Sequence, residues 1–246
     1  MKSQNNIYEK FVSKKGQIAI LIDPEKTNSE KDLLKIVKNS EIAEIDYFFI
    51  GGSTVTKHDF DKTIVTLKKI TNIPIVIFPG SSQQISEKAD AILYLSLISG
   101  RNPDFLIGHH VESASELFKM DLEIIPTGYI LIDGGTKSSV AYVSQTTPIP
   151  RDQTTIAINT ATAGVLLGKK IIYYDAGSGA NDNVPFEIIE QTNKLNIPII
   201  VGGGIKSFDS IVEYKNSGAN IIVIGNHIEN NIDFILDIKN LKLKSN

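Results

Sequence analysis

The chain contains no cysteine among its 246 residues. This absence excludes disulfide bonds, thiolate metal sites and a cysteine nucleophile, and by itself leaves the cellular compartment open. Long apolar runs are also missing, since none approaches the roughly 20 residues that a membrane-spanning helix needs. The N-terminal sequence MKSQNNIYEKFVSKKGQ carries charges where a secretion signal requires an apolar segment. We therefore expect a cytoplasmic protein.

Neither sign of charge dominates, because 25 Lys and Arg residues stand against 28 Asp and Glu residues, a net charge of −3. The basic residues are scattered, so the basic patch of a nucleic-acid-binding protein is absent and we expect no nucleic-acid partner. A phosphorylated small molecule is the better partner. The basic C-terminal sequence KNLKLKSN leaves open a peripheral membrane contact through anionic lipid, with a frayed helix end as the alternative.

Short apolar runs bounded by Gly, Pro or Asp alternate with longer amphipathic segments, a pattern typical of βα units around a parallel sheet. The predicted strands are residues 17–23, 47–51, 73–79, 91–96, 124–132, 171–174, 197–201 and 221–225. The predicted helices are residues 29–39, 57–70, 103–119, 154–168, 185–195, 208–217 and 231–241. Eight strands with helical crossovers and no break in composition favour a single α/β domain over residues 1–246, a (β/α)₈ TIM-like barrel.

One βα unit is irregular. Only GSSQQISEKAD, residues 80–90, separates the third and fourth predicted strands, which is too short for a full barrel helix with its loops. We predict an irregular segment in place of the third helix, which could leave an apolar groove in the barrel wall. The alternative is that the third helix is merely shortened. The longest loop candidate is residues 133–152, and long loops in compact domains often act as lids.

Three strand ends open into glycine. These are YYDAGSGA at residues 173–180, PIIVGGGI at residues 198–205 and IIVIGN at residues 221–226. Turns made of small residues let several backbone N–H groups converge on an anion. Because the ends of neighbouring strands meet on one face of a barrel, the three loops together predict one phosphate-binding cup.

Polar residues that follow the first two strands are candidate metal ligands. Asp23 ends the first strand, where it either caps the turn before Pro24 or binds Mg²⁺, a hard cation that prefers carboxylate and phosphate oxygens. Ser53 or Thr54 follows the second strand and either adds a hydroxyl ligand or caps the next helix.

Candidate catalytic residues follow later strands. Arg101 precedes a helix N-terminus and either binds a diphosphate, which guanidinium groups hold bidentately, or is a solvated loop residue. Tyr129 either orients a substrate hydroxyl or packs in the core. Asp175 lies between its strand and the glycine turn, where it could accept a proton from a substrate alcohol. His109 and His110 lack metal-site spacing and are predicted to be structural.

The stretches ILIDPEK, FFIGGSTVT, SLISGRNPDFLIG, PTGYILIDGGTKS, YYDAGSGA, VGGGI and IGN resemble the geranylgeranylglyceryl phosphate synthase family over nearly the whole chain. The resemblance implies a barrel in which an irregular segment replaces one outer helix. It also implies a Mg²⁺-dependent prenyltransferase that joins sn-glycerol 1-phosphate to a prenyl diphosphate, geranylgeranyl diphosphate, and releases diphosphate. Family members are homo-oligomers, so we expect a dimer or a hexamer.

The resemblance also implies roles for individual residues. Mg²⁺ would lie on Asp23 and Ser53, Tyr129 would contact glycerol phosphate, and Arg101 would face the leaving diphosphate. The remaining substrate-binding residues would be Tyr173, Tyr174, Asp175, Ala176, Gly177, Ser178, Gly179, Gly203, Gly204, Gly225 and Asn226. The family usually carries glutamate where this chain has Asp175, so it stays open whether Asp175 is the base or only orients the alcohol.

Three other functions remain as alternatives. A heptaprenylglyceryl phosphate synthase would use the same chemistry with a longer prenyl diphosphate. A phosphosugar isomerase or aldolase barrel would share the phosphate cup, but it should carry a strand-end lysine or a pair of acids, and none is evident. A non-catalytic phosphate- or lipid-binding barrel would not need Asp23 and Ser53, which are both present.

Overall fold

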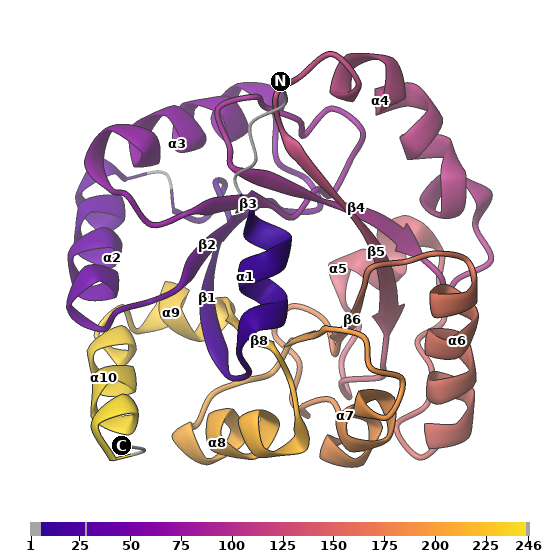
Figure 1. Cartoon of the computed structure of the whole chain (residues 1–246). Coiled ribbons are helices and arrows are strands. Elements are labelled where there is room, and N and C mark those ends of the chain that lie inside the picture. Colours follow the sequence, from indigo (N-terminus) through magenta and orange to yellow (C-terminus); the bar gives the residue numbers. More distant parts are fainter. Residues whose placement is uncertain (1–5, 28, 245–246) are drawn as a thin grey trace.

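Eight parallel strands close into a barrel in the computed structural model, which describes residues 6–27 and 29–244 (Figure 1). The strands are β1 (Gln17–Ile22), β2 (Tyr47–Ile50), β3 (Ile75–Ile77), β4 (Ala91–Leu97), β5 (Glu123–Leu131), β6 (Ile171–Asp175), β7 (Ile199–Gly202) and β8 (Ile221–Ile224). Each strand pairs with its sequence neighbour, and β8 closes the barrel on β1 with Val223 opposite Ala19. The strands are rich in Ile and Val because helices and the barrel interior bury both of their faces. The predicted barrel is confirmed.

An outer ring of helices covers the barrel. Its members are α2 (Glu30–Ile42), α3 (Lys57–Ile70), a π-helical turn (Asp104–Gly108) continuing into α4 (His109–Leu117), α6 (Thr154–Leu166), α7 (Phe186–Asn193), α8 (Phe208–Ser217) and α10 (Phe234–Lys244). Three short helices were not predicted: α1 (Ile7–Ser13), α5 (Ser139–Ser144) and α9 (Asn226–Asn230). Within the described part of the chain, no helix is both long and apolar enough to cross a membrane. For the predicted lipid contact, the side chains from residue 240 onward lie outside the described residues.

Helix α1 closes the amino end of the barrel (Figure 1). Phe11 is fully buried, and its ring packs edge-on against the ring of Tyr47 at a centroid distance of 4.8 Å. The carboxylate of Glu123 accepts hydrogen bonds from the backbone N–H groups of Ile7 at 2.7 Å and Tyr8 at 3.0 Å. A carboxylate at a helix N-terminus satisfies amides that lack helical partners. Helix α1 therefore covers the barrel interior at the amino ends of the strands.

The connection between β3 and β4 contains no helix, as predicted, and α3 and α4 flank the resulting break in the ring (Figure 1). Gln84 holds this connection in place. Its buried side-chain amide donates to the carbonyl of Gly52 at 2.8 Å and accepts from the backbone N–H of Gly80 at 2.9 Å. The irregular segment is thus fixed to the loop that follows β2. The long loop after β5, for which we predicted a lid, contains α5.

Candidate active site

A cavity opens at the carboxyl ends of the strands, where barrel enzymes carry out their chemistry. It brings together most of the residues predicted from the sequence. Those that line it are Asp23, Ser53, Tyr129, Tyr173, Asp175, Gly177, Ser178, Gly179, Gly203, Gly204, Gly225 and Asn226. They come from the ends of β1, β2, β5, β6, β7 and β8, so the closed sheet assembles residues that are far apart in the sequence.

Three predicted site residues lie outside this cavity. Side chains alternate along a strand, so Tyr173 and Asp175 point inward while Tyr174 points out toward α7. There the Tyr174 hydroxyl lies 2.7 Å from Oγ1 of Thr192. The side chain of Ala176 packs in the outer core between barrel and helices. The side chains of these two residues do not line the cavity, so any substrate contact predicted for them would have to be made by their backbone.

Arg101 is the third residue outside the cavity. It is exposed, and its guanidinium donates to the carbonyl of the preceding residue, Gly100, at 2.7 Å. The π-helical turn that follows begins at Asp104, after Pro103 as its cap. Arg101 therefore lies before this turn and is not among the cavity-lining residues. The predicted contact between Arg101 and a leaving diphosphate is not supported by this geometry.

Asp175 and Tyr129 form a buried hydrogen-bonded pair in the cavity wall. The Tyr129 hydroxyl donates to Oδ2 of Asp175 at 2.6 Å, and the backbone N–H of Gly177 donates to Oδ1 at 2.7 Å. Burial raises the pKa of the Asp175 carboxyl, while the two hydrogen bonds oppose that rise. Burial and the neighbouring Asp175 charge raise the pKa of Tyr129, so the tyrosine keeps its proton. The arrangement provides a partly desolvated carboxylate, as proton transfer requires.

Aromatic rings form the floor beside this pair. The ring of Phe78 stacks on Tyr173 at 5.1 Å and meets Tyr129 edge-on at 5.8 Å. The close approach of Tyr173 to β7 requires glycine, because a Cβ added to Gly202 would lie 2.8 Å from the Tyr173 hydroxyl. The floor is therefore rigid and largely apolar apart from two phenolic hydroxyls.

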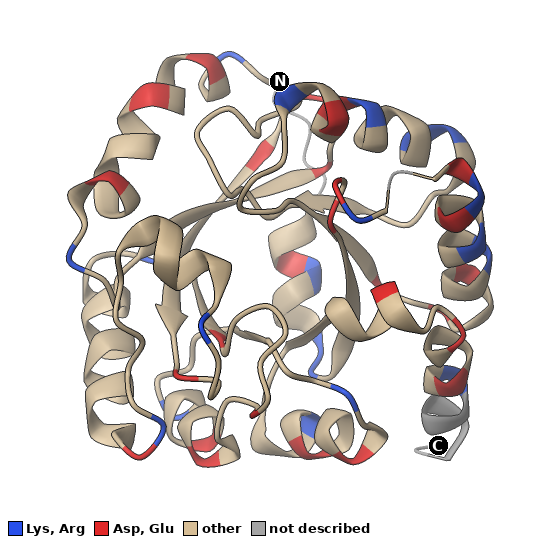
Figure 2. Cartoon of the chain, turned by 180° about the vertical axis from the view of Figure 1, so that it is seen from behind, with Lys and Arg blue, Asp and Glu red and all other residues tan. Residues whose placement is uncertain are grey.

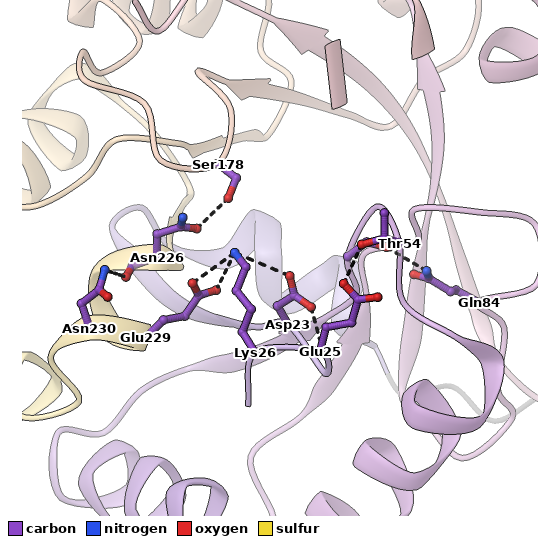
Figure 3. A network of polar contacts seen from close by, with 10 residues as sticks. Asp23, Glu25, Lys26, Thr54, Gln84, Ser178, Asn226, Glu229 and Asn230 are labelled. Atoms are coloured by element: carbon purple, nitrogen blue, oxygen red, sulfur yellow. Dashed lines mark hydrogen bonds and ion pairs between the residues drawn. The ribbon is translucent and has the colours of Figure 1, made fainter. Parts of the chain in front are cut away.

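The three glycine loops lie against one another. A Cβ added to Gly203, which has φ +82°, would lie 2.5 Å from Oδ1 of Asp175 and 2.6 Å from the backbone nitrogen of Ala176. The Ser178 hydroxyl donates to Oδ1 of Asn226 at 2.8 Å, which connects the turn after β6 to the start of α9 (Figure 3). The ends of β6, β7 and β8 thus form one continuous concave surface with backbone close to its face, the geometry of a phosphate site.

Asp23 lies against the loop that carries Ser53, where β1 and β2 end. A Cβ on Gly52, the residue before Ser53, would lie 2.8 Å from Oδ1 of Asp23. Burial raises the pKa of Asp23, partly offset by the backbone N–H of Glu25, which donates to Oδ1 at 3.1 Å. The described residues contain no cluster of three or more His, Asp or Glu side chains suited to a metal. One carboxylate and one hydroxyl match Mg²⁺, which proteins often hold through few side chains together with substrate phosphates.

An apolar groove leads from the cavity into the break between β3 and β4. Its wall includes Ile85, Ile92, Tyr94 and Ser113 from the irregular segment, β4 and α4. The predicted apolar groove is present, in preference to a shortened helix. His110 also borders it, with a ring nitrogen 2.7 Å from the Leu95 carbonyl and its ring 4.1 Å from that of Tyr94.

Comparison with known proteins matches residues 10–242 to the model of the PcrB family. The chain belongs to the PcrB family. It is 45% identical to geranylgeranylglyceryl phosphate synthase of Chitinophaga pinensis over 95% of this chain and 94% of that protein. It is 48% identical to the Flavobacterium johnsoniae protein of the same name, over 90% and 92% of the two chains.

A solved structure shows that the similarity extends to the fold. The (S)-3-O-geranylgeranylglyceryl phosphate synthase of Thermoplasma acidophilum, crystallised in complex with its substrate sn-glycerol-1-phosphate, is similar to this PcrB-family chain with a TM-score of 0.89. The two chains share 31% sequence identity, and the match covers 100% of this chain and 98% of the other.

The sequence-based prediction missed four charged residues that line the site of this PcrB-family barrel: Glu25, Lys26, Lys206 and Glu229. Lys26 lies between Asp23 and Glu229, with its Nζ 3.7 Å from Oδ2 of Asp23 and 3.1 Å from Oε2 of Glu229 (Figure 3). Lys206 donates from Nζ to the carbonyl of Ala180 at 2.8 Å. Both lysines closely follow a strand-end motif, DPEK or GGGIK, and this position was the available signal. No motif in the sequence marked Glu229, because its position in the site depends on the short helix α9, which was not predicted.

Proposed function

We propose that this chain is a prenyltransferase that joins sn-glycerol 1-phosphate to geranylgeranyl diphosphate, giving geranylgeranylglyceryl phosphate and diphosphate. One observation carries the proposal: the glycine cup, the Asp175–Tyr129 pair and the apolar groove belong to one cavity. A phosphate, a reacting hydroxyl and a long apolar tail can therefore be bound side by side. The named relatives and the glycerol phosphate complex of the similar Thermoplasma acidophilum enzyme support the same conclusion.

The residues divide the reaction between them. The cup formed by the loops after β6, β7 and β8 holds the phosphate of glycerol phosphate, and so directs its 3-hydroxyl toward the cavity. The hydroxyl oxygen bonds to C1 of the prenyl group as the bond between C1 and the diphosphate oxygen breaks. Asp175 takes the hydroxyl proton, and the hydrogen bond from Tyr129 holds the carboxylate in position. The apolar groove places the prenyl chain so that C1 lies near the hydroxyl.

We further propose that the reaction depends on Mg²⁺, held by Asp23 and Ser53. Oxygen donors of this kind suit a hard cation, and Asp23 lies against the loop that carries Ser53, beside the cup rather than within it. When bound, the ion offsets negative charge on the diphosphate and makes it a better leaving group. Asp23 and Ser53 thereby fix which part of the cavity the diphosphate occupies.

The test is a turnover assay with purified protein, geranylgeranyl diphosphate and either sn-glycerol 1-phosphate or sn-glycerol 3-phosphate, with and without Mg²⁺. The extracted lipid is identified by mass. We expect product from the 1-phosphate alone and only when Mg²⁺ is present. Longer prenyl diphosphates, run in parallel, measure the preferred chain length. Folded protein that gives no product with any pair would contradict the proposal and favour a binding barrel.

We also propose that the chain forms a homo-oligomer, a dimer or a hexamer, through the outer face of α6. This helix has no charged residue, and Ile156, Leu166 and the following Leu167 are 49%, 83% and 75% exposed. Figure 2 shows α6 uncoloured along its length, whereas α2 and α3 carry many charged residues. Exposed apolar side chains on an uncharged helix are typical of a surface that another protein surface covers.

A further inference from the structure

Lys26 is the described cation nearest to the predicted metal ligand Asp23. Its Nζ lies 3.7 Å from Oδ2 of Asp23, while Oε1 and Oε2 of Glu229 lie at 3.3 and 3.1 Å (Figure 3). The Lys26 side chain is 42% exposed and lines the cavity, whereas the two carboxylates are mostly buried. The ammonium group is therefore held by acids on one side and accessible to a ligand on the other.

The backbone fixes Lys26 at a boundary within the cavity. The N–H groups of Lys26 and Thr27 both donate to the carbonyl of Asp23, so the turn after β1 holds the lysine next to the metal-binding end. Glu229 belongs to α9, whose first residue, Asn226, accepts the hydrogen bond from Ser178 in the glycine cup. The ion pair thus lies between the Asp23 end of the cavity and the cup.

The proposed substrates carry two anionic groups, the phosphate of glycerol phosphate and the diphosphate of the prenyl substrate. Because they bind at different places in the cavity, each needs its own cationic side chain. Among the described residues, the cavity lining contains two lysines and no arginine. Lys206 donates to the carbonyl of Ala180, at the end of the glycine turn, and so belongs to the cup. Lys26 remains for the anion at the Asp23 end. Arg101, the cation that the sequence suggested for that anion, lies outside the cavity.

We propose that Lys26 binds the diphosphate of the prenyl substrate, and that Glu229 positions its ammonium group for this contact. This inference rests on the proposed function and adds to it the residue that stabilises the leaving group. Lys26 donates hydrogen bonds to diphosphate oxygens, which gain negative charge as the C1–O bond breaks. Its pairing with Glu229 keeps the flexible side chain over the cavity before the substrate arrives, which lowers the entropic cost of binding.

The test measures binding of inorganic pyrophosphate by isothermal titration calorimetry, with Mg²⁺ and saturating sn-glycerol 1-phosphate present so that the cup is already filled. We expect Lys26→Met to weaken pyrophosphate binding by about tenfold to a hundredfold, the usual range for a hydrogen bond to a charged group. Lys26→Arg should recover most of the loss because it retains the charge. Lys35→Met is the matched control: it removes a lysine paired with an acid, Asp233 at 2.9 Å, outside the cavity lining.

A separate titration with sn-glycerol 1-phosphate alone distinguishes a specific loss of pyrophosphate binding from general damage to the site. Lys26→Met should bind it within about twofold of the unchanged protein and unfold at the same temperature. Pyrophosphate binding that matches the unchanged protein, loss of glycerol phosphate binding alone, or equal loss of both ligands would each overturn the proposal. Because pyrophosphate binding needs no turnover, an unchanged protein that binds pyrophosphate but makes no lipid would contradict the prenyltransferase function and not the role of Lys26.

Discussion

The carboxylate of Asp175 is buried in the wall of the cavity, and the residue is only 8% exposed. Its raised pKa means that the ionised form is less stable in the folded chain than in water. This cost is absent below the pKa of the unfolded chain and grows as the pH rises through the raised folded pKa. The site thus retains a charge that weakens the fold, a compromise typical of catalytic groups.

Replacing Asp175 with Asn should lower kcat by about 10²- to 10⁴-fold, because the amide cannot accept the proton. The amide oxygen can accept from the Gly177 N–H while the amide NH₂ donates to the Tyr129 hydroxyl oxygen, so the fold should be as stable as the unchanged protein at pH 7 or more stable. Near pH 4 this advantage should shrink, since the aspartate is then protonated. Steady-state kinetics and thermal unfolding at both pH values measure the two effects. Activity within tenfold of the unchanged protein would exclude Asp175 as the base.

Gly203 offers a second prediction at the scale of a single residue. Ala at this position would have to adopt φ +82° and place its Cβ 2.5 Å from Asp175, so both strain and a clash follow. Gly203→Ala should weaken sn-glycerol 1-phosphate binding by at least tenfold and lower stability by more than about 1–2 kcal/mol. Gly168→Ala is the control because Gly168 has φ +81° but no neighbour within 4 Å, so it should show strain alone. Calorimetric titration and chemical unfolding distinguish the two variants.

Among the secondary-structure elements, the absence of a helix between β3 and β4 matters most for the site, because it leaves the groove open. A helix in this position would cover the outer face of the two strands; instead, Ile92 and Tyr94 of β4 border a groove. Helix α4 supplies the facing wall, with Ser113 buried beside them. We therefore expect the side chains of α4 and β4 to limit the length of the apolar tail that the groove accepts.

Ser113→Phe should fill the groove and shift the preference toward shorter prenyl diphosphates, because the larger ring occupies space next to Tyr94. We expect kcat/KM for geranylgeranyl diphosphate to fall by at least tenfold relative to that for geranyl diphosphate. Ser115→Phe is the control on the same helix, since Ser115 is exposed and should leave the ratio unchanged. Competition between the two diphosphates in one reaction gives the ratio directly, and equal shifts in both variants would contradict the assignment of the groove.

At the scale of the whole molecule, the proposed oligomer depends on the uncharged outer face of α6. Leu167→Glu should place a charge in the proposed interface and convert oligomers to monomers at micromolar concentration, because burying an unpaired charge is costly. Lys62→Glu, on exposed α3, changes charge without changing the oligomer. Analytical ultracentrifugation measures both. A monomeric unchanged protein, or an unaffected Leu167→Glu oligomer, would contradict the proposal.

The sequence by itself determined the barrel, because each strand is a short apolar run such as Ile221–Ile224 and each run is followed by a helix or a glycine turn. It also determined the cup, since glycine is the residue type that tolerates φ +82° at Gly203 so close to Asp175. The absent third helix followed from chain length alone, because residues 80–90 are too few. These features depend on local pattern and spacing, which a single sequence shows directly.

Only the tertiary structure decided which side chains share the cavity. Tyr173 and Tyr174 are neighbours of the same type, yet the pleat of β6 turns one inward and the other toward Thr192. Helices α1, α5 and α9 are only five to seven residues long and owe their stability to packing and capping, so periodicity did not reveal them. The Lys26–Glu229 pair joins residues about 200 positions apart. Closure of the barrel through pairing of β8 with β1 brings them together, and no local pattern encodes that contact.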